Sequence, residues 1–516
     1  MFRHLFLLAV TLAFLAACAI SPADSTALPP ATTKPTFPLA ATPPAAESDT
    51  SFLGIAWDAP EIFAPGLIAS QQQNASIPGA TVYHMTLTID ESLTLVHGQA
   101  EIRYTNRESV PLNEIGLRLY PNIIGGKTDI LQVTLNRQVT EPTYSLANSL
   151  MTVKLPAALP VGENIVIWVD FTARVPTDAN KNYGVLAAQD GVLTLAHAYP
   201  MVAVYDETGW NAEIPSELGD LTYADASFYI VQVTAPKKVT LVATGREISA
   251  GNTDTAQVVT FALGPARDFM LAAVSGYQKF SQDEGDITVN CYVPEKFVRT
   301  APTALETARV ALRTFSQRYS PYPYTEFDII ATPTFALGVE YPGLTAIAAN
   351  LFDGSNTTFS TPVMVMLEST LTHEIGHQWF YNLVGNDQLD QPWLDESLAQ
   401  FATWQYFDDR YGAPGGDGYR ASLEGRWARV EKQEIPVGRP VAAYVGPEYS
   451  AIVYGRGALF FFALRDEIGQ PAFDDFLKNY VRDFSWEIAT TPQIKAAAES
   501  SCGCQLDDLF AKWVDG

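Results

Sequence analysis

Leu371-Thr372-His373-Glu374-Ile375-Gly376-His377-Gln378-Trp379-Phe380 contains the motif His-Glu-x-x-His, and it follows a largely apolar run over residues 363–370. If the whole run is helical, His373 and His377 lie one turn apart on the same helix face. Two imidazoles at this spacing can bind one zinc ion, and Glu374 then lies beside the metal as a candidate general base. The stretch therefore predicts a metal-binding helix in the second half of the chain.

A third ligand is expected, because a catalytic zinc site has three protein ligands and one open position. Glu396 follows His377 with eighteen residues between them, and apolar residues recur at helical spacing from Asp395 to Phe407. A second helix packed against the first would bring Glu396 to the metal. Two histidines four residues apart also occur by chance on amphipathic helices, but residues 198–516 contain no other histidine.

The segments His373-Glu374-Ile375-Gly376-His377-Gln378-Trp379 and Trp393-Leu394-Asp395-Glu396 together resemble the aminopeptidase N family of gluzincin zinc metallopeptidases. That family has His-Glu-x-x-His, eighteen residues and then Glu, usually within Trp-Leu-Asn-Glu-Gly. Here Asp395 and Ser397 replace the usual Asn and Gly. The resemblance implies one zinc ion per chain, bound by His373, His377 and Glu396, with Glu374 as the general base.

Two further segments resemble motifs of the same family. Leu337-Gly338-Val339-Glu340-Tyr341 is similar to Gly-x-Met-Glu-Asn, whose glutamate binds the free α-amine of the substrate, and only that glutamate is retained. Val453-Tyr454-Gly455-Arg456-Gly457 is similar to Tyr-x-Lys-Gly, whose tyrosine donates a hydrogen bond to the developing oxyanion. The resemblance therefore implies that Glu340 binds substrate and that Tyr454 is catalytic. The alternatives are a surface-loop carboxylate and a packing aromatic residue.

The first residues are typical of a secretory signal peptide. Met1-Phe2-Arg3-His4 precedes the apolar run Leu5–Ala17, which is too short to span a bilayer, since that requires about 20 residues. Leu15-Ala16-Ala17-Cys18 resembles the lipobox of bacterial lipoproteins, whose cysteine is lipidated and becomes the mature N-terminus. The alternative is an ordinary signal peptide with a stray cysteine.

We therefore expect residues 1–17 to be a signal peptide and residues 18–50, rich in Pro, Ala and Thr, to be a disordered tether. The predicted protein is an extracytoplasmic bacterial lipoprotein, held at the membrane through Cys18. Its formal net charge of −25 argues against nucleic acid as a partner and against adhesion to an anionic lipid surface.

A change of sequence periodicity near Val298 divides the rest of the chain. Before it, strand patterns punctuated by turn-forming residues predict strands over Tyr83–Ile89, Gly98–Tyr104, Asn164–Val175, Ser227–Thr244 and Asp286–Val293. After it, the patterns predict a helix over Ala301–Tyr319, a strand over Glu326–Ala331, a loop over Ala413–Gly418, and helices over Phe473–Phe484 and Thr491–Val514.

The predicted fold is α+β and multidomain, with an N-terminal β-rich domain over residues 75–295 and a mainly helical catalytic domain over residues 296–516. The family resemblance implies that the second domain is a thermolysin-like zinc metallopeptidase domain. Relatives use the region where the two domains meet to help anchor substrate, and His197 and Glu207 lie in that region.

The cysteine count does not predict a disulfide framework. If Cys18 carries lipid, three cysteines remain, which are Cys291, Cys502 and Cys504. Cys502-Gly503-Cys504 could be a metal-binding or redox-active pair. The alternative is that the two cysteines are partly buried thiols or form one local disulfide.

The predicted function is that of a zinc-dependent metallopeptidase, specifically an aminopeptidase that hydrolyses N-terminal residues from peptides. A zinc endopeptidase is an alternative that would lack a functional amine anchor. A catalytically silent peptide-binding module is another, and the intact Glu374 counts against it because binding does not require a general base.

Overall fold

The computed structural model describes residues 50–516, except 180–181, 356 and 359–360. The predicted signal peptide, the lipobox and all but the last residue of the predicted tether lie outside the described residues. None of the helices in the described part of the chain is long and apolar enough to cross a membrane.

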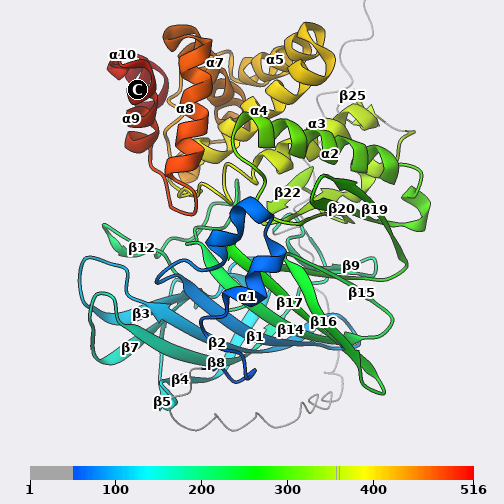
Figure 1. Ribbon diagram of the computed structural model, residues 1–516, viewed down its shortest axis with the longest axis vertical. Helices are drawn as coiled ribbons and strands as arrows, with labels where there is room; N and C mark the ends of the chain where they lie inside the picture. Colours follow the sequence, from blue (N-terminus) through cyan, green and yellow to red (C-terminus); the bar gives the residue numbers. More distant parts are fainter. Residues whose placement is uncertain (1–49, 180–181, 356, 359–360) are drawn as a thin grey trace, which may run out of the picture. The chain divides into compact units, whose positions relative to one another are not determined.

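An eight-stranded sheet forms the centre of the β-rich half (Figure 1). In sheet order its strands are β16 (Arg246–Asn252), β17 (Ala256–Ala266), β14 (Ser227–Pro236), β1 (Thr81–Ile89), β2 (Leu95–Thr105), β8 (Asn164–Arg174), β4 (Lys127–Leu135) and β5 (Gln138–Thr140). β1 pairs in parallel with β14, and the other neighbours are antiparallel. The predicted strand over Ser227–Thr244 is interrupted after Pro236, because a turn there separates β14 from the next strand, β15 (Thr240–Ala243).

Two smaller sheets complete this half. One has the order β15 (Thr240–Ala243), β18 (Met270–Val274), β10 (Val192–Ala196) and β9 (Leu186–Gln189). The other has the order β11 (Met201–Val202), β3 (Leu112–Arg118), β7 (Leu150–Leu159) and β6 (Thr143–Ser145), and a short hairpin pairs β12 (Tyr205–Asp206) with β13 (Gly209–Trp210). Every residue of β10 and β18 is buried, so these strands contribute both faces to the core.

A five-stranded sheet begins the C-terminal half, in the order β19 (Tyr277–Glu284), β20 (Ile287–Pro294), β21 (Glu326–Thr332), β23 (Leu344–Ala348) and β22 (Gly338–Tyr341). β19 and β20 precede residue 296, the predicted domain boundary, and nevertheless pair within this sheet. Helix α2 (Ala301–Arg318) packs against them, in agreement with the predicted helix. The edge strand β22 carries Glu340 and lies antiparallel to β23.

Helices α3 (Val363–Gly376) and α4 (Trp393–Tyr411) carry the predicted metal ligands and pack against each other. Gly376 allows this close approach, since a Cβ there would lie only 3.3 Å from the Ala399 Cα. A short hairpin of β24 (Thr357–Thr358) and β25 (Thr361–Pro362) precedes α3. The structure thus confirms helices α3 and α4, which the sequence predicted around His373 and Glu396.

The predicted loop over Ala413–Gly418 is wrong, because these residues begin helix α5 (Ala413–Trp427). Pro414 lies in the first helical turn, where its missing N–H has no intrahelical partner to lose. Gly415 lets α5 pack closely on α4, since a Cβ there would lie 2.5 Å from the Phe407 carbonyl oxygen. The glycines that indicated a loop therefore serve helix packing.

The remaining helices are α6 (Glu448–Ala451), a π-helical turn over Ile452–Arg456, α7 (Gly457–Ile468), α8 (Gln470–Asp483), α9 (Thr491–Cys502), α10 (Asp507–Phe510) and a second π-helical turn over Ala511–Asp515. α8 confirms the helix predicted over Phe473–Phe484. A short helix α1 (Pro60–Phe63) precedes the first strand.

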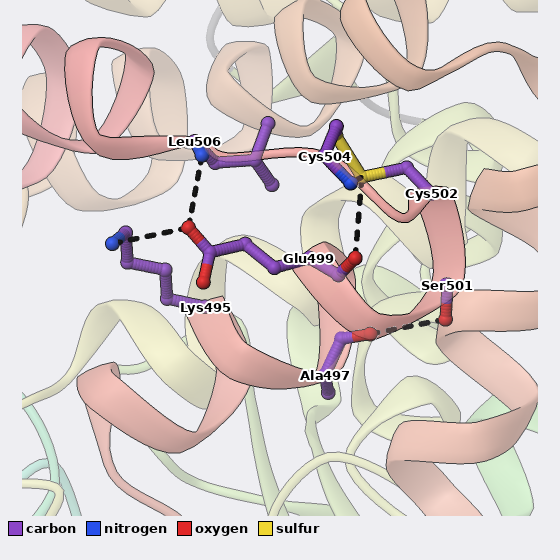
Figure 2. Close-up of a disulfide and its surroundings, with 7 residues drawn as sticks. All are labelled: Lys495, Ala497, Glu499, Ser501, Cys502, Cys504 and Leu506. Carbon is purple, nitrogen blue, oxygen red and sulfur yellow. Dashed lines mark hydrogen bonds and ion pairs between the residues drawn. A yellow bond between two sulfur atoms is a disulfide. The ribbon is translucent and has the colours of Figure 1, made fainter.

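The helix predicted over Thr491–Val514 is wrong in its length, because it is broken after Cys502. Gly503 ends α9 in the left-handed conformation, with φ of 63°. Cys502 and Cys504 form a disulfide across this turn, which Figure 2 shows. Glu499 Oε1 accepts hydrogen bonds from the Leu506 N–H at 2.9 Å and from Lys495 Nζ at 3.2 Å, so the chain beyond the turn is fixed to α9.

Arg267, which follows β17, connects the β-rich half to the C-terminal half. Its side chain is 1% exposed and donates hydrogen bonds to the carbonyl oxygens of Tyr381, Asn382, Leu383 and Glu487. Gly385 leaves space for the guanidinium, since a Cβ there would lie 2.5 Å from Arg267 Cζ. The segment that follows the His-Glu-x-x-His motif is thereby positioned by a residue of the β-rich half.

Candidate active site

Three donor atoms converge where α3 packs on α4. His373 Nε2 lies 3.1 Å from Glu396 Oε2, His377 Nε2 lies 3.5 Å from the same oxygen, and the two Nε2 atoms are 3.3 Å apart. Although burial opposes it, hydrogen bonding to both histidines lowers the pKa of Glu396, which favours the anionic form that can bind a metal ion. The structure therefore brings together the three predicted metal ligands.

The chemistry of this donor set fits zinc. His377 Nδ1 lies 3.0 Å from the Phe380 carbonyl oxygen, which can only accept a hydrogen bond, so Nδ1 carries the proton. In the neutral imidazole, the Nε2 lone pair is then directed at the cluster. Two imidazoles and one carboxylate leave a tetrahedral zinc ion one position for water or substrate.

The two departures from the usual family sequence around Glu396 are accommodated locally. Asp395 Oδ1 accepts the Glu396 N–H at 2.7 Å, and its Oδ2 accepts Gln388 Nε2 at 2.8 Å. Burial and the charge of Glu396 raise the pKa of Asp395 to about 7. Ser397 Oγ donates to the Val453 carbonyl oxygen at 2.7 Å, in space left free by Gly457, where a Cβ would lie 2.1 Å from that hydroxyl.

Glu374, the predicted general base, is buried next to the three ligands. It is 4% exposed, and burial together with the negative charge of Glu340 raises its pKa. Gly338 provides the space for its carboxylate, because a Cβ at that position would lie 2.4 Å from Glu374 Oε1. A carboxylate whose pKa is raised binds a proton more readily than an exposed one, which suits a group that accepts and returns a proton.

Glu340 is a buried residue of strand β22 and not the surface-loop carboxylate of the alternative interpretation. It is 7% exposed, and its ligand atom lies within 4.8 Å of those of Glu374 and His377. Gln388 Nε2 donates a hydrogen bond to Glu340 Oε1 at 3.3 Å. Burial and then the negative charge of Asp220 raise the pKa of Glu340, although the charge of His377 acts in the opposite direction.

Tyr454 lies in the π-helical turn Ile452–Arg456, a backbone irregularity that is frequent at functional sites. Its hydroxyl donates a hydrogen bond to Glu396 Oε1, and its ring centroid is 5.8 Å from that of His373. The neighbouring Arg456 is 1% exposed and donates to the carbonyl oxygens of Ile435, Lys512 and Trp513. It therefore links the turn to the C-terminal segment.

All six predicted site residues line one cavity of about 390 Å³. The cavity also contains residues that the sequence did not indicate, among them Asp220 and Arg426. Asp220 belongs to a segment without regular structure, and burial and the carboxylates of Glu396 and Asp395 raise its pKa. No periodic pattern marks that segment, so sequence reasoning had no signal for it.

The wall contributed by the β-rich half contains His197. Its Nε2 lies 3.0 Å from Asp268 Oδ2 and 2.9 Å from Thr222 Oγ1, and the Tyr381 hydroxyl donates to the same Asp268 oxygen at 2.9 Å. His197 thus lines the cavity, as the family resemblance implied for its region, whereas Glu207 is exposed and is not among the lining residues.

Residues 303–513 match the family model described as the peptidase family M1 domain. The chain is 22% identical to Aminopeptidase 2 of Candida albicans over 466 residues, which are 87% of this chain and 48% of that protein. It is 26% identical to Aminopeptidase M1-B of Oryza sativa subsp. japonica over 221 residues, 41% of this chain and 25% of that protein. The chain therefore spans half or less of the length of these relatives.

Solved structures share the fold. The M1 zinc metallopeptidase from Deinococcus radiodurans has 20% sequence identity and a TM-score of 0.62, with 85% of this chain and 94% of that chain covered. A mutant of that enzyme bound to a Tyr-Ser-Ala substrate gives a TM-score of 0.63, with 84% and 93% covered. These likenesses confirm the predicted fold, in which a β-rich region is followed by a mainly helical region.

Proposed function

We propose that this chain, a member of the aminopeptidase N family of zinc metallopeptidases, hydrolyses the N-terminal residue from peptides. One observation carries the proposal, which is the convergence of the His373, His377 and Glu396 donor atoms beside Glu374 in a cavity that also contains Glu340. The relatives named above are aminopeptidases or M1 metallopeptidases, which supports the same reaction.

Each residue has a role that follows from its position. Zinc bound by His373, His377 and Glu396 would supply a Lewis acid and lower the pKa of water in the site. Glu374 would accept the proton of the attacking water and return it to the leaving amine, so the proton is conserved over the reaction.

The substrate would be held by two further groups. The Tyr454 hydroxyl, at the rim of the ligand cluster, would donate a hydrogen bond to the oxygen on which negative charge develops. Glu340 would form a charge-assisted hydrogen bond with the free α-ammonium of the substrate. This contact would restrict hydrolysis to the N-terminal residue. It distinguishes an aminopeptidase from an endopeptidase.

The test combines metal analysis with two kinds of substrate. Purified protein should contain about one zinc per chain, and His377→Ala should lose it. Alanine p-nitroanilide should be hydrolysed, its N-acetylated form should be a poor substrate, and a chelator should abolish hydrolysis until zinc is restored. Chelator-resistant hydrolysis, or equal hydrolysis of the free and acetylated forms, would overturn the aminopeptidase assignment.

We also propose that Cys18 carries lipid and holds the mature protein at the outside of a bacterial membrane. The support is the sequence Leu15-Ala16-Ala17-Cys18 at the end of an apolar run. The predicted tether, residues 18–50, would then act as a spacer between the lipid and the folded region.

A further inference from the structure

Arg426 is the only lysine or arginine among the described residues that line the active-site cavity. The lining of the same cavity includes six carboxylate side chains, namely Glu217, Asp220, Asp268, Glu340, Glu374 and Glu396. Arg426 lies at the end of helix α5, and its Cζ atom is 5.7 Å from the ring centroid of Tyr454. A single cation is thus placed beside the residue to which the oxyanion role is assigned.

The Arg426 guanidinium has no hydrogen-bond or ion-pair partner within the described part of the chain. Other arginines of this region are paired: Arg420 lies 3.7 Å from Glu424 on the same helix, and Arg456 donates to three carbonyl oxygens. A guanidinium presents five N–H donors in a planar fork whose geometry matches a carboxylate. The Arg426 guanidinium is therefore available to bind an anionic group in the cavity.

Charges of opposite sign are separated inside this cavity. Glu340 and Asp220 lie near each other, since the charge of Asp220 is, after burial, the main cause of the raised pKa of Glu340. Arg426 lies instead beside Tyr454 and Tyr419, and none of the described carboxylates of the cavity is within ion-pair distance of it. A short unblocked peptide has the matching arrangement, with an ammonium at one end and a carboxylate at the other.

We infer that Arg426 binds the C-terminal carboxylate of short peptide substrates, and that the enzyme consequently prefers short peptides with a free C-terminus. This inference rests on the proposed aminopeptidase function and specifies its substrate class. With the α-ammonium held at Glu340, an extended chain advances at most about 3.3–3.6 Å per residue. Its terminal carboxylate can therefore reach Arg426 at only one or two chain lengths, and longer peptides would lose the contact.

The test compares alanine peptides of two to five residues as free acids and as C-terminal amides, with zinc-loaded full-length protein. The readout is the ratio of kcat/KM for the acid to kcat/KM for the amide in one preparation, so any difference in folded fraction cancels. At the best length the wild-type ratio should be on the order of ten, as expected for a charge-assisted hydrogen bond in a partly solvated site. The ratio should fall towards one for the longest peptides.

Arg426→Met should reduce the ratio to about one at every length, and Arg426→Lys should retain part of it because it keeps the charge without the fork. Arg429→Met is the matched control, since Arg429 is exposed three residues further on and is not a lining residue. It should keep the wild-type ratio.

Two results would overturn the inference. A wild-type ratio near one at all lengths would show that the carboxylate is not recognised. An Arg426→Met variant that loses activity on acids and amides equally would show that Arg426 acts through Tyr454 instead. Hydrolysis of alanine p-nitroanilide in either case leaves the proposed function intact, whereas failure to hydrolyse any of these substrates overturns both.

Discussion

The Tyr454 hydroxyl donates a hydrogen bond to Glu396 Oε1, while the other oxygen of the same carboxylate faces His373 and His377. The two oxygens of Glu396 are thus divided between the ligand cluster and the tyrosine. Because Tyr454 contacts a proposed metal ligand and is not itself one, its proposed catalytic role can be tested separately from metal binding.

Tyr454→Phe should keep the zinc content and lose activity. Loss of one oxyanion donor typically lowers kcat by about 10²–10³-fold. The measurements are kcat on alanine p-nitroanilide and zinc per chain. Tyr444→Phe is a suitable control, because Tyr444 is also buried, donates to the Val437 carbonyl oxygen and lies outside the cavity lining. A kcat for Tyr454→Phe as high as that of the control would exclude the oxyanion role.

Glu374→Gln should bind zinc and fold like the wild type but lose hydrolysis by about 10²–10⁴-fold, since an amide of the same size cannot accept the proton of the attacking water. Zinc content and kcat are the measurements. Glu368→Gln on the same helix is the control, because Glu368 accepts the hydroxyls of Tyr406 and Tyr411 outside the cavity. Substantial activity in Glu374→Gln would remove Glu374 from the mechanism.

Glu340→Ala should impair free-amine substrates much more than N-acetylated ones. A charge-assisted hydrogen bond to the ammonium is worth about 1.5–3 kcal/mol, which corresponds to roughly ten- to a hundredfold in kcat/KM. The ratio of kcat/KM for free and acetylated alanine p-nitroanilide measures this directly. If the ratio is the same in variant and wild type, the amine anchor lies elsewhere.

The convergence of the three candidate metal ligands could be predicted because its sequence signals are local. His373, Glu374 and His377 occupy one turn of one helix, and the helical spacing after residue 393 placed Glu396 on a second helix. Glu340 was identified by the one retained residue of its motif, and Tyr454 by a motif that retains the tyrosine and the final glycine, Gly457. Their surroundings, including the space that Gly338 leaves for Glu374, depend on contacts between distant segments.

Other features could not be predicted, because they depend on tertiary packing. Packing either overrides the local sequence signal or brings together residues that have no such signal. Gly415 indicated a loop, yet it lies in a helix where the absence of a side chain permits contact with Phe407. Asp220 and Arg426 reach the cavity from a segment without regular structure and from the end of α5, and neither position carries a pattern. Their roles depend on which residues face them across the cavity.

The anchor prediction concerns Cys18, which lies outside the described residues. Two acyl chains bury many methylene groups at about 0.8 kcal/mol each, so mature protein should partition into the detergent phase of a Triton X-114 extract. Cys18→Ser should move it to the aqueous phase or leave the signal peptide uncleaved. If wild type and variant are both processed and partition identically, the protein is not anchored through this cysteine.

The buried His84 in β1 should make the stability of the protein depend on pH. This side chain is fully buried, stacks on Trp57 with ring centroids 4.7 Å apart, and neither ring nitrogen has a hydrogen-bond partner within the described residues. Burial and the charge of Arg103 lower its pKa from 6.5 to about 3. In the unfolded chain, His84 is therefore protonated below about pH 6.5. In the folded protein, it stays neutral until the pH falls to about 3.

Because the folded pKa is depressed, stability is fully present above about pH 6.5 and falls as the pH drops towards 3. At pH 5 this single group should already have cost roughly 2 kcal/mol of the free energy of unfolding. His84→Phe keeps an aromatic ring against Trp57 but removes the titration, so its stability relative to wild type should improve by about that amount between pH 7.5 and pH 5. Urea unfolding of both proteins at the two pH values measures this difference, and titrations elsewhere cancel in the comparison. If the difference in free energy of unfolding between the two proteins is the same at pH 7.5 and pH 5, His84 is protonated in the folded protein or its titration is not linked to folding.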